Sequence, residues 1–296
     1  MRVIAVPLAV LLALCAVLIG FVPVLLRARP TPPPQPELGT VVSAVSVSSG
    51  TVRPVLTLRG QYAFPTVTAD GTALVLEKPL PLAGTEVWRV PLDGGTPRRI
   101  GRMGIFTTPA WSPDGHERAS TSDGQTVVVD RLDGTRVRTL TKLHGYGGFS
   151  MPSWGGSFIA FERQSRPATG WRLDLEVWNA TGSRAWRTAV PFAQGALAVA
   201  PDGRRVAVVA GRTLWLVTSH SRTVLATGAR KFWPPLWTPD QRSLVYIDEL
   251  GRVVVHDVAA GTSRVVAHGK IGEIALSPDG QTIYLARVND AVSIPK

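Results

Sequence analysis

Short apolar runs alternate with polar turns along the chain from about residue 40 to the C-terminus. The runs ALVLE, FIAFE and RVAVVA each lie a few residues after a turn that contains Gly. Runs of this length, enriched in β-branched and aromatic residues and bounded by turn residues, are typical of β-strands. The pattern therefore predicts an all-β domain built from many short strands.

One turn sequence recurs almost unchanged. It reads PAWSPDG at residues 109–115, and related copies are TADG at 68–71, APDG at 200–203, TPDQ at 238–241 and SPDG at 277–280. The anchor residues of the six copies are separated by 44, 41, 47, 38 and 39 positions: Asp70, Asp114, Gly155, Asp202, Asp240 and Asp279. A period near 40 residues indicates a repeat architecture.

Each repeat contains four strand-like runs, which in the first copy are FPTVT, ALVLE, EVWRVPL and TPRRI. Six such four-stranded sheets bury both of their faces when they are arranged around an axis, so we predict a six-bladed β-propeller of antiparallel blades over residues 40–296. The polar run HERASTS (116–122) and the Gly-Gly turn of the third copy indicate two irregular blades.

The last repeat is short and must be completed by other residues. After TIYLARV only NDAVSIPK remains, which can supply a third strand but no fourth. The run TVRPVLTL (51–58) has the pattern of a fourth strand, so we expect it to close the ring and remove two exposed sheet edges.

The N-terminal segment has a different character. Residues 3–26 contain no charged side chain, and as a helix they would span roughly 36 Å, more than the ~30 Å hydrocarbon core of a membrane. We predict a retained anchor over residues 1–29, with a cleaved signal peptide or a lipid on Cys15 as the alternatives. The proline-rich residues 30–39 are predicted to form a stiff linker.

The distribution of charged residues bears on the kind of partner and on the orientation in the membrane. The net charge of +11 comes almost entirely from Arg spread along the chain, which fits either a generally basic surface or attraction to an acidic partner. Basic residues flank both ends of the predicted span, so they do not fix its orientation. A short charged start followed by an apolar run resembles an export signal. We therefore expect a single-pass protein of the cytoplasmic membrane with its propeller outside.

Three stretches resemble the repeats of TolB-like propellers, which are related to the WD-repeat fold: PAWSPDG (109–115), LWTPDQRSLVYI (236–247) and LSPDGQTIYLA (276–286). The resemblance covers about residues 40–296. It implies a propeller that serves as a protein-interaction platform or as a gating domain of a larger peptidase. The chain differs from TolB itself because it lacks a separate N-terminal α/β domain and carries the predicted anchor.

Motifs for catalysis are absent from the sequence. There is no GxSxG elbow, no nucleotide-binding glycine loop and no metal-ligand spacing among the five histidines,. His256 is expected to face solvent or a neighbouring strand. The repeated Asp could bind calcium, but each copy lies in a separate blade, so we predict that it caps its own turn. No catalytic residue, cofactor or metal ion is predicted.

Tryptophans recur at two positions of the repeat and are predicted to pack between blades. Three precede the turn and three lie in the third strand: Trp111, Trp154, Trp237, Trp88, Trp178 and Trp215.

The segments that join one blade to the next vary most. In a propeller they emerge on one face, around the mouth of the central channel. Their aromatic and basic side chains form our candidate binding rim: Tyr62, Phe64, Phe106, Tyr146, Phe149, Phe192, Arg230, Lys231, Phe232, Trp233 and Lys270. Exposed aromatic and cationic groups suit a docking surface, although the same aromatics could instead fill gaps between blades.

The predicted function is therefore binding without catalysis, as a scaffold or recognition module. The expected partner is a protein or peptide, or else an acidic envelope polymer, and no nucleic acid partner is expected. Two alternatives remain: a lyase or glycan-acting enzyme with its site at the channel mouth, and an interaction propeller that faces the cytoplasm. An enzyme predicts a cluster of titratable groups with perturbed pKa values in the channel.

Overall fold

The structure is a computed structural model that describes residues 39–80, 84–103, 110–144, 147–167, 170–191, 195–269 and 271–289. The chain divides into two units, Met1–Glu37 and Leu38–Lys296, and all described residues belong to the second. Within these ranges no helix is long and apolar enough to cross a membrane. The predicted anchor and the linker up to residue 38 lie outside the described residues.

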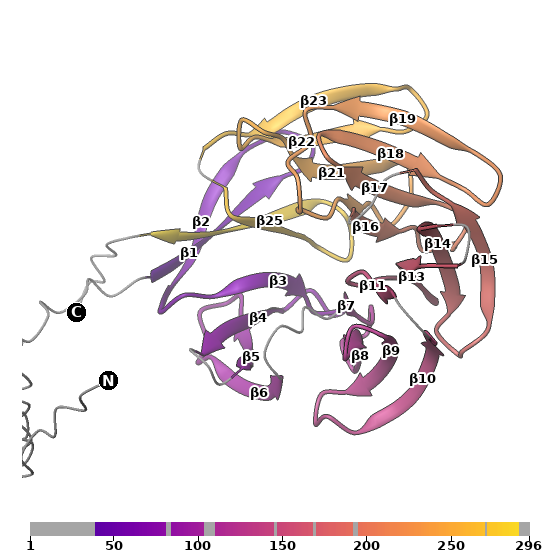
Figure 1. Ribbon diagram of the computed structural model, residues 1–296. Helices are drawn as coiled ribbons and strands as arrows, with labels where there is room; N and C mark the ends of the chain where they lie inside the picture. The colour runs from indigo at the N-terminus through magenta and orange to yellow at the C-terminus, as the bar shows by residue number, and fades with distance from the viewer. Residues whose placement is uncertain are drawn as a thin grey trace, which may run out of the picture. The chain divides into compact units, whose positions relative to one another are not determined.

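Six antiparallel sheets follow one another as the blades of a propeller (Figure 1). Each blade begins with its inner strand, and the first three blades contain these strands: β3 (Ala63–Val67), β4 (Ala73–Leu80), β5 (Gly84–Pro91) and β6 (Arg98–Met103) in blade 1; β7 (Ala110–Trp111), β8 (Glu117–Ser122), β9 (Thr126–Arg131) and β10 (Arg136–Lys142) in blade 2; β11 (Gly147–Phe149), β12 (Ser153–Gly155), β13 (Phe158–Ser165), β14 (Arg172–Asn179) and β15 (Arg184–Ala189) in blade 3.

The other three blades follow in the same way: β16 (Ala196–Val199), β17 (Val206–Ala210), β18 (Thr213–Val217) and β19 (Arg222–Thr227) in blade 4; β20 (Leu236–Trp237), β21 (Ser243–Ile247), β22 (Val253–Asp257) and β23 (Thr262–Ala267) in blade 5; β24 (Glu273–Leu276), β25 (Thr282–Asn289), β1 (Gly39–Ser46) and β2 (Val52–Arg59) in blade 6. The six-bladed, four-stranded architecture predicted from the repeat is confirmed.

Blade 6 joins the two ends of the described chain. The expectation that residues 51–58 supply its fourth strand is confirmed by β2, but the expected third strand is wrong. That position is taken by β1, which pairs with β25 on one side and β2 on the other. Gly39–Ser46 competes better for this place than NDAVSIPK because it offers a longer β-branched run, whose Val42 and Val45 are fully buried.

The two blades expected to be irregular differ from each other. In blade 3 the inner strand is split, since β11 and β12 both pair with β13, which confirms the irregularity. In blade 2 the polar run forms a complete strand, β8, paired along its length with β9. Its polar character does not weaken it because Arg118 and Ser120 are buried against neighbouring structure.

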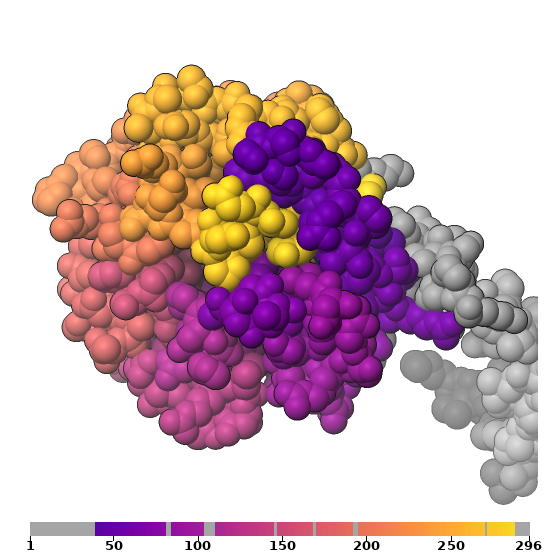
Figure 2. All heavy atoms as spheres, turned by 180° about the vertical axis from the view of Figure 1, so that it is seen from behind, coloured from indigo at the N-terminus to yellow at the C-terminus, as the bar shows by residue number. Residues whose placement is uncertain are grey.

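The core consists of apolar clusters between blades. The described residues form six clusters, each shared by two consecutive blades. All six tryptophans predicted to pack between blades belong to or border these clusters, and Trp237 of blade 5 also donates to Ala198 O of blade 4 at 2.9 Å. Figure 2 shows the ring in chain order, with the N-terminal strands beside the C-terminal ones.

The repeated Asp caps its own turn, as predicted. Asp114 Oδ1 accepts hydrogen bonds from Ser112 Oγ at 2.6 Å and from His116 N at 3.0 Å. The same pattern holds at Asp70, Asp240 and Asp279. These hydrogen bonds stabilise the ionised carboxylate and lower its pKa at all four positions, to about 2 for Asp70,.

Candidate functional site

The described residues include seven of the eleven predicted rim side chains. Phe106, Tyr146, Phe192 and Lys270 lie outside them. The remaining seven fall into two classes, since some fill space between strands and others point outward.

Tyr62 and Phe149 fill space. Tyr62 is 6% exposed and meets Trp88 edge-on at 6.4 Å, with Lys78 Nζ 5.7 Å from its ring. Burial raises the pKa of the Tyr62 hydroxyl. Phe149 lies edge-on to Phe161 at 5.3 Å beside the blade 2–blade 3 cluster. At these two positions the aromatics close gaps between strands, which was the alternative considered for the whole rim.

The connection into blade 5 presents an aromatic side chain on a braced loop. Arg230 Nη1 donates to Ile271 O at 2.9 Å, and its guanidinium lies 4.1 Å from the centre of the Trp233 ring. Trp233 Nε1 donates to Gly272 O. Between these two braces, Phe232 is 59% exposed, and Lys231 Nζ lies 4.5 Å from its ring centre.

The connection into blade 1 contacts the other side of the same blade 6 segment. The Phe64 backbone N–H donates to the Glu273 carboxylate, and the Phe64 side chain is 44% exposed. Residues 271–273 therefore join the loops that carry Phe64 and Phe232. We call Phe64, Arg230, Lys231, Phe232, Trp233 and Glu273 the rim patch.

Both exposed phenylalanines adopt a backbone conformation that bulky side chains rarely take. Phe64 has φ 49° and Phe232 has φ 69°. Such residues cost on the order of 1–3 kcal/mol each, and they persist only where surrounding contacts determine them. Here the contacts are the hydrogen bonds to Glu273, Ile271 and Gly272.

Two glutamates, Glu77 of blade 1 and Glu273 of blade 6, were missed by sequence reasoning. Glu77 is 2% exposed, and Glu273 lies close enough to interact with it electrostatically. Burial raises the pKa of the Glu77 carboxyl to about 8 and that of Glu273 to about 7. A charged residue inside an otherwise apolar strand, as in ALVLE, was the available signal.

The histidines contribute nothing to the rim patch. His256 is buried rather than facing solvent, and its Nδ1 lies 2.8 Å from Ser263 Oγ on the neighbouring strand β23. Burial lowers the pKa of its imidazole. Across the described ranges no group of three or more metal-binding side chains occurs.

No protein-family model matches the chain, and no curated protein matches it. Among solved structures, a protein provisionally assigned as TolB in Agrobacterium tumefaciens is 18% identical, with a TM-score of 0.64; the alignment covers 85% of this chain and 99% of that one. TolB from Acinetobacter baumannii is 16% identical, with a TM-score of 0.50, over 85% of this chain and 65% of that one. This chain therefore spans about two thirds of the Acinetobacter protein. The likeness shows a TolB-like six-bladed propeller fold.

Proposed function

We propose that this chain is a non-catalytic propeller that binds a protein or peptide partner through the rim patch. The observation that carries the proposal is the pair of exposed phenylalanines at positive φ, braced on either side of one blade 6 segment. Folding alone does not favour a strained backbone that exposes an aromatic ring to water. A partner that buries both rings supplies the missing stabilisation.

The chemistry of the patch indicates the kind of partner. Covering each ring removes apolar area from water at roughly 25 cal/mol per Å², and aromatic residues are frequent among the side chains that dominate binding energy. Lys231 beside Phe232 is exposed and adds positive charge. The patch therefore fits a partner that offers an apolar pocket or groove with acidic residues at its edge.

The proposed location follows from the sequence of the N-terminal unit. We place the propeller outside the cytoplasmic membrane, held by residues 3–26 and separated from the surface by the proline-rich linker. A reporter enzyme that is active only after export, fused to the C-terminus, is expected to be active. Activity of a reporter that works only in the cytoplasm would support the inward-facing alternative.

Site-specific cross-linking tests the binding function. A photoreactive amino acid replaces Phe64 or Phe232 in the full chain, and a matched chain carries it at Val224, which is 47% exposed on the outer strand β19. The rim positions are expected to capture the same discrete partner, and position 224 is not. Identical products from all three positions, or none from either rim position, would overturn the proposal.

Phe232→Gly separates binding from folding. Glycine adopts positive φ without strain, so the free energy of unfolding is expected to change by less than about 1 kcal/mol, as the relieved strain offsets the greater freedom of the unfolded chain. Capture of the partner through a cross-linker at position 64 is expected to fall at least about tenfold, a typical loss when a central aromatic contact is removed. Full retention of capture would show that Phe232 does not contact the partner.

The glutamate pair favours a second candidate, an acid–base enzyme. A carboxyl whose pKa is raised to about 7 or 8 is protonated near neutral pH and can act as a general acid,. Against this role, Glu77 is enclosed between blades 1 and 2, and Glu273 already accepts the Phe64 N–H. Hydrolysis or elimination of envelope glycans by the wild type, lost in Glu273→Gln, would establish the enzyme; unchanged glycans would leave binding as the function.

A further inference from the structure

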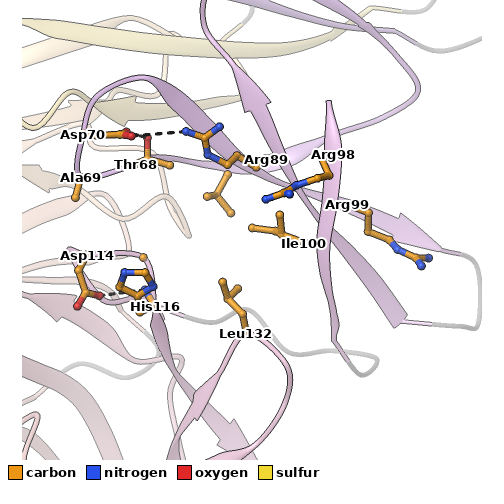
Figure 3. Close-up of a pocket in the computed structure, with 12 residues that line it drawn as sticks. Thr68, Ala69, Asp70, Arg89, Arg98, Arg99, Ile100, Asp114, His116 and Leu132 are labelled. Carbon is orange, nitrogen blue, oxygen red and sulfur yellow. Dashed lines mark hydrogen bonds and ion pairs between the residues drawn. The ribbon is translucent and has the colours of Figure 1, made fainter. Parts of the chain in front are cut away.

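A groove opens between blades 1 and 2 at the ends of the strands opposite the rim patch. It has a volume of about 730 Å³ and is lined by the turn that contains Asp70, the turn that contains Asp114, and parts of β5, β6 and the turn after β9 (Figure 3). Phe64 and Asp70 lie at opposite ends of the inner hairpin of blade 1. The groove and the rim patch are therefore separate surfaces.

The groove lies beside a turn that lacks the proline found in blades 2, 4, 5 and 6. In blades 5 and 6 the residue before the turn Asp is Pro239 or Pro278, and its ring reaches toward the turn glycine of the next blade. A Cβ added to Gly280 would lie 2.7 Å from Pro239 Cδ, and one added to Gly71 would lie 3.8 Å from Pro278 Cδ. Blade 1 has Ala69 at this position, and a Cβ on Gly115 of blade 2 would meet nothing within 4 Å.

The walls of the groove are cationic and its floor is apolar. Arg89, Arg98, Arg99 and His116 line it, together with Val75, Ile100 and Leu132. Arg89 lies 3.6 Å from Asp70, and Arg99 donates to Glu86 at 3.0 Å. The Arg98 residue pairs with Arg89 in the β5–β6 ladder, but its side chain has no hydrogen-bond or ion-pair partner within the described part of the chain. Figure 3 shows it between Arg89 and Arg99.

The two acidic residues of the groove do not cancel this charge for a ligand. Asp70 and Asp114 use one carboxylate oxygen each to cap their turns. They are fixed parts of the wall, whereas the exposed guanidinium of Arg98 is unpaired. The groove thus offers bidentate donors for carboxylates above a surface for apolar side chains.

We propose that this groove binds an acidic peptide segment of a partner protein, with a carboxylate at Arg98 and an apolar side chain on Ile100 and Leu132. Charge complementarity supports this occupant, because guanidinium groups on the walls match acidic side chains. The volume suits a ligand of a few residues. This second site is independent of the partner proposed for the rim patch.

A set of labelled peptides tests the proposal on the full chain in detergent. The probe is a fluorescein-labelled, C-terminally amidated hexapeptide of alternating Leu and Asp, measured by fluorescence anisotropy. Its controls alternate Leu with Lys, and Ser with Asp. A seventh-residue extension with a free C-terminal carboxylate distinguishes recognition of a chain end from recognition of side chains.

Two substitutions in the groove are expected to weaken peptide binding, and one control substitution is not. Arg98→Gln removes the unpaired cation without breaking a described ion pair and is expected to weaken Leu–Asp binding about tenfold, as for loss of one charge-assisted contact. Ala69→Pro introduces the proline found in four of the other five turns and is expected to abolish binding by narrowing the groove. Arg222→Gln on the outer strand β19 is the control and leaves binding unchanged.

The outcomes separate cleanly. The proposal is supported if the Leu–Asp peptide binds the wild type, binds Arg98→Gln more weakly, binds Arg222→Gln as well as the wild type, and does not bind Ala69→Pro. Equal binding of the Leu–Lys peptide, equal weakening by Arg222→Gln, or undiminished binding by Ala69→Pro each overturns it. Because Phe232→Gly is expected to leave this binding intact, failure here is distinguishable from failure of the rim proposal.

Discussion

The interface between blades 5 and 6 and the interface between blades 1 and 2 arise from the same repeat but are filled differently. The first is an apolar cluster of eleven buried residues that includes Val253 and Ile283. Among the described residues, which leave out 104–109 between these two blades, the second has four buried apolar residues. Among the described residues, three buried polar atoms of this interface have no hydrogen-bond partner: Trp111 Nε1 within the cluster, and Glu77 Oε1 and Arg118 Nη1.

This difference shows how a ring can divide stability and binding among equivalent positions. Burial of apolar area stabilises a blade interface in proportion to the area removed from water. Polar atoms left unpaired in the interior cost free energy. The blade 5–blade 6 interface is therefore stabilised more by apolar burial, while the blade 1–blade 2 interface contains the groove.

The largest effect is expected from matched valines in the third strands of two blades. Val253→Ala in blade 5 removes a fully buried side chain from the larger cluster and is expected to lower the free energy of unfolding by about 2–3 kcal/mol,. Val87→Ala in blade 1, equally buried, is expected to cost about 1–2 kcal/mol because fewer apolar side chains of the described residues surround it,. Urea denaturation measures both, and equal losses would remove the energetic difference between the interfaces.

A pH series on Glu77→Gln sharpens the comparison next. The folded-state pKa of Glu77, about 8, exceeds its ordinary value of 4.5. The stability contributed by its protonation is complete below pH 4.5 and is lost as pH rises through about 8,. When the pH is raised from 6 to 9, the free energy of unfolding of Glu77→Gln is expected to fall by about 2–3 kcal/mol less than that of the wild type, as judged by unfolding midpoints in urea.

Glu162 provides the control for this experiment. It occupies the same fifth position of the second strand in blade 3, but its two carboxylate oxygens accept the Gly195 N–H at 3.2 and 3.1 Å. Glu162→Gln is expected to lower stability by about 1 kcal/mol, because only one of the two oxygens that accept the Gly195 N–H is kept,. If the stabilities of both glutamine variants depend on pH in the same way, the blade 1–blade 2 environment does not raise the pKa of Glu77.

The smallest effect is expected from exchanging the turn residues of the two interfaces. Pro239→Ala opens the blade 5–blade 6 turn contact and is expected to lower stability by about 0.5–1 kcal/mol, whereas Ala69→Pro is expected to raise it by about the same amount. The Ala69 turn makes the same backbone hydrogen bonds as the proline-containing turns, so proline fits there. Thermal unfolding of both variants measures the effect, and destabilisation by Ala69→Pro would show that this turn differs from the others.

The propeller fold could be predicted from the sequence because the repeat consists of short-range contacts within each blade and with its neighbour. The turn Asp, the tryptophans in register and the 40-residue period each reflect contacts that every blade repeats. The third strand of blade 6 was misassigned because pairing across the ring depends on which end of the chain packs better, and local pattern does not rank β1 against the C-terminal residues.

The candidate sites were less predictable, for physical reasons. The sequence showed that Tyr62 and Phe232 are aromatic residues in connecting loops, but whether a ring packs inward or points outward depends on backbone angles and neighbouring blades. Ala69 in place of proline is visible in TADG. The sequence does not show that a proline ring at this position reaches the next blade; only the three-dimensional arrangement does.

The closing blade also determines how the propeller responds to mechanical load. A pull transmitted through the residues before Gly39 enters β1, which is hydrogen-bonded on both sides, to β2 and to β25. These bonds run perpendicular to the strand, so a force along β1 shears both ladders together instead of opening them one bond at a time. The strand that joins the two ends of the described chain is thus also the one best placed to carry tension.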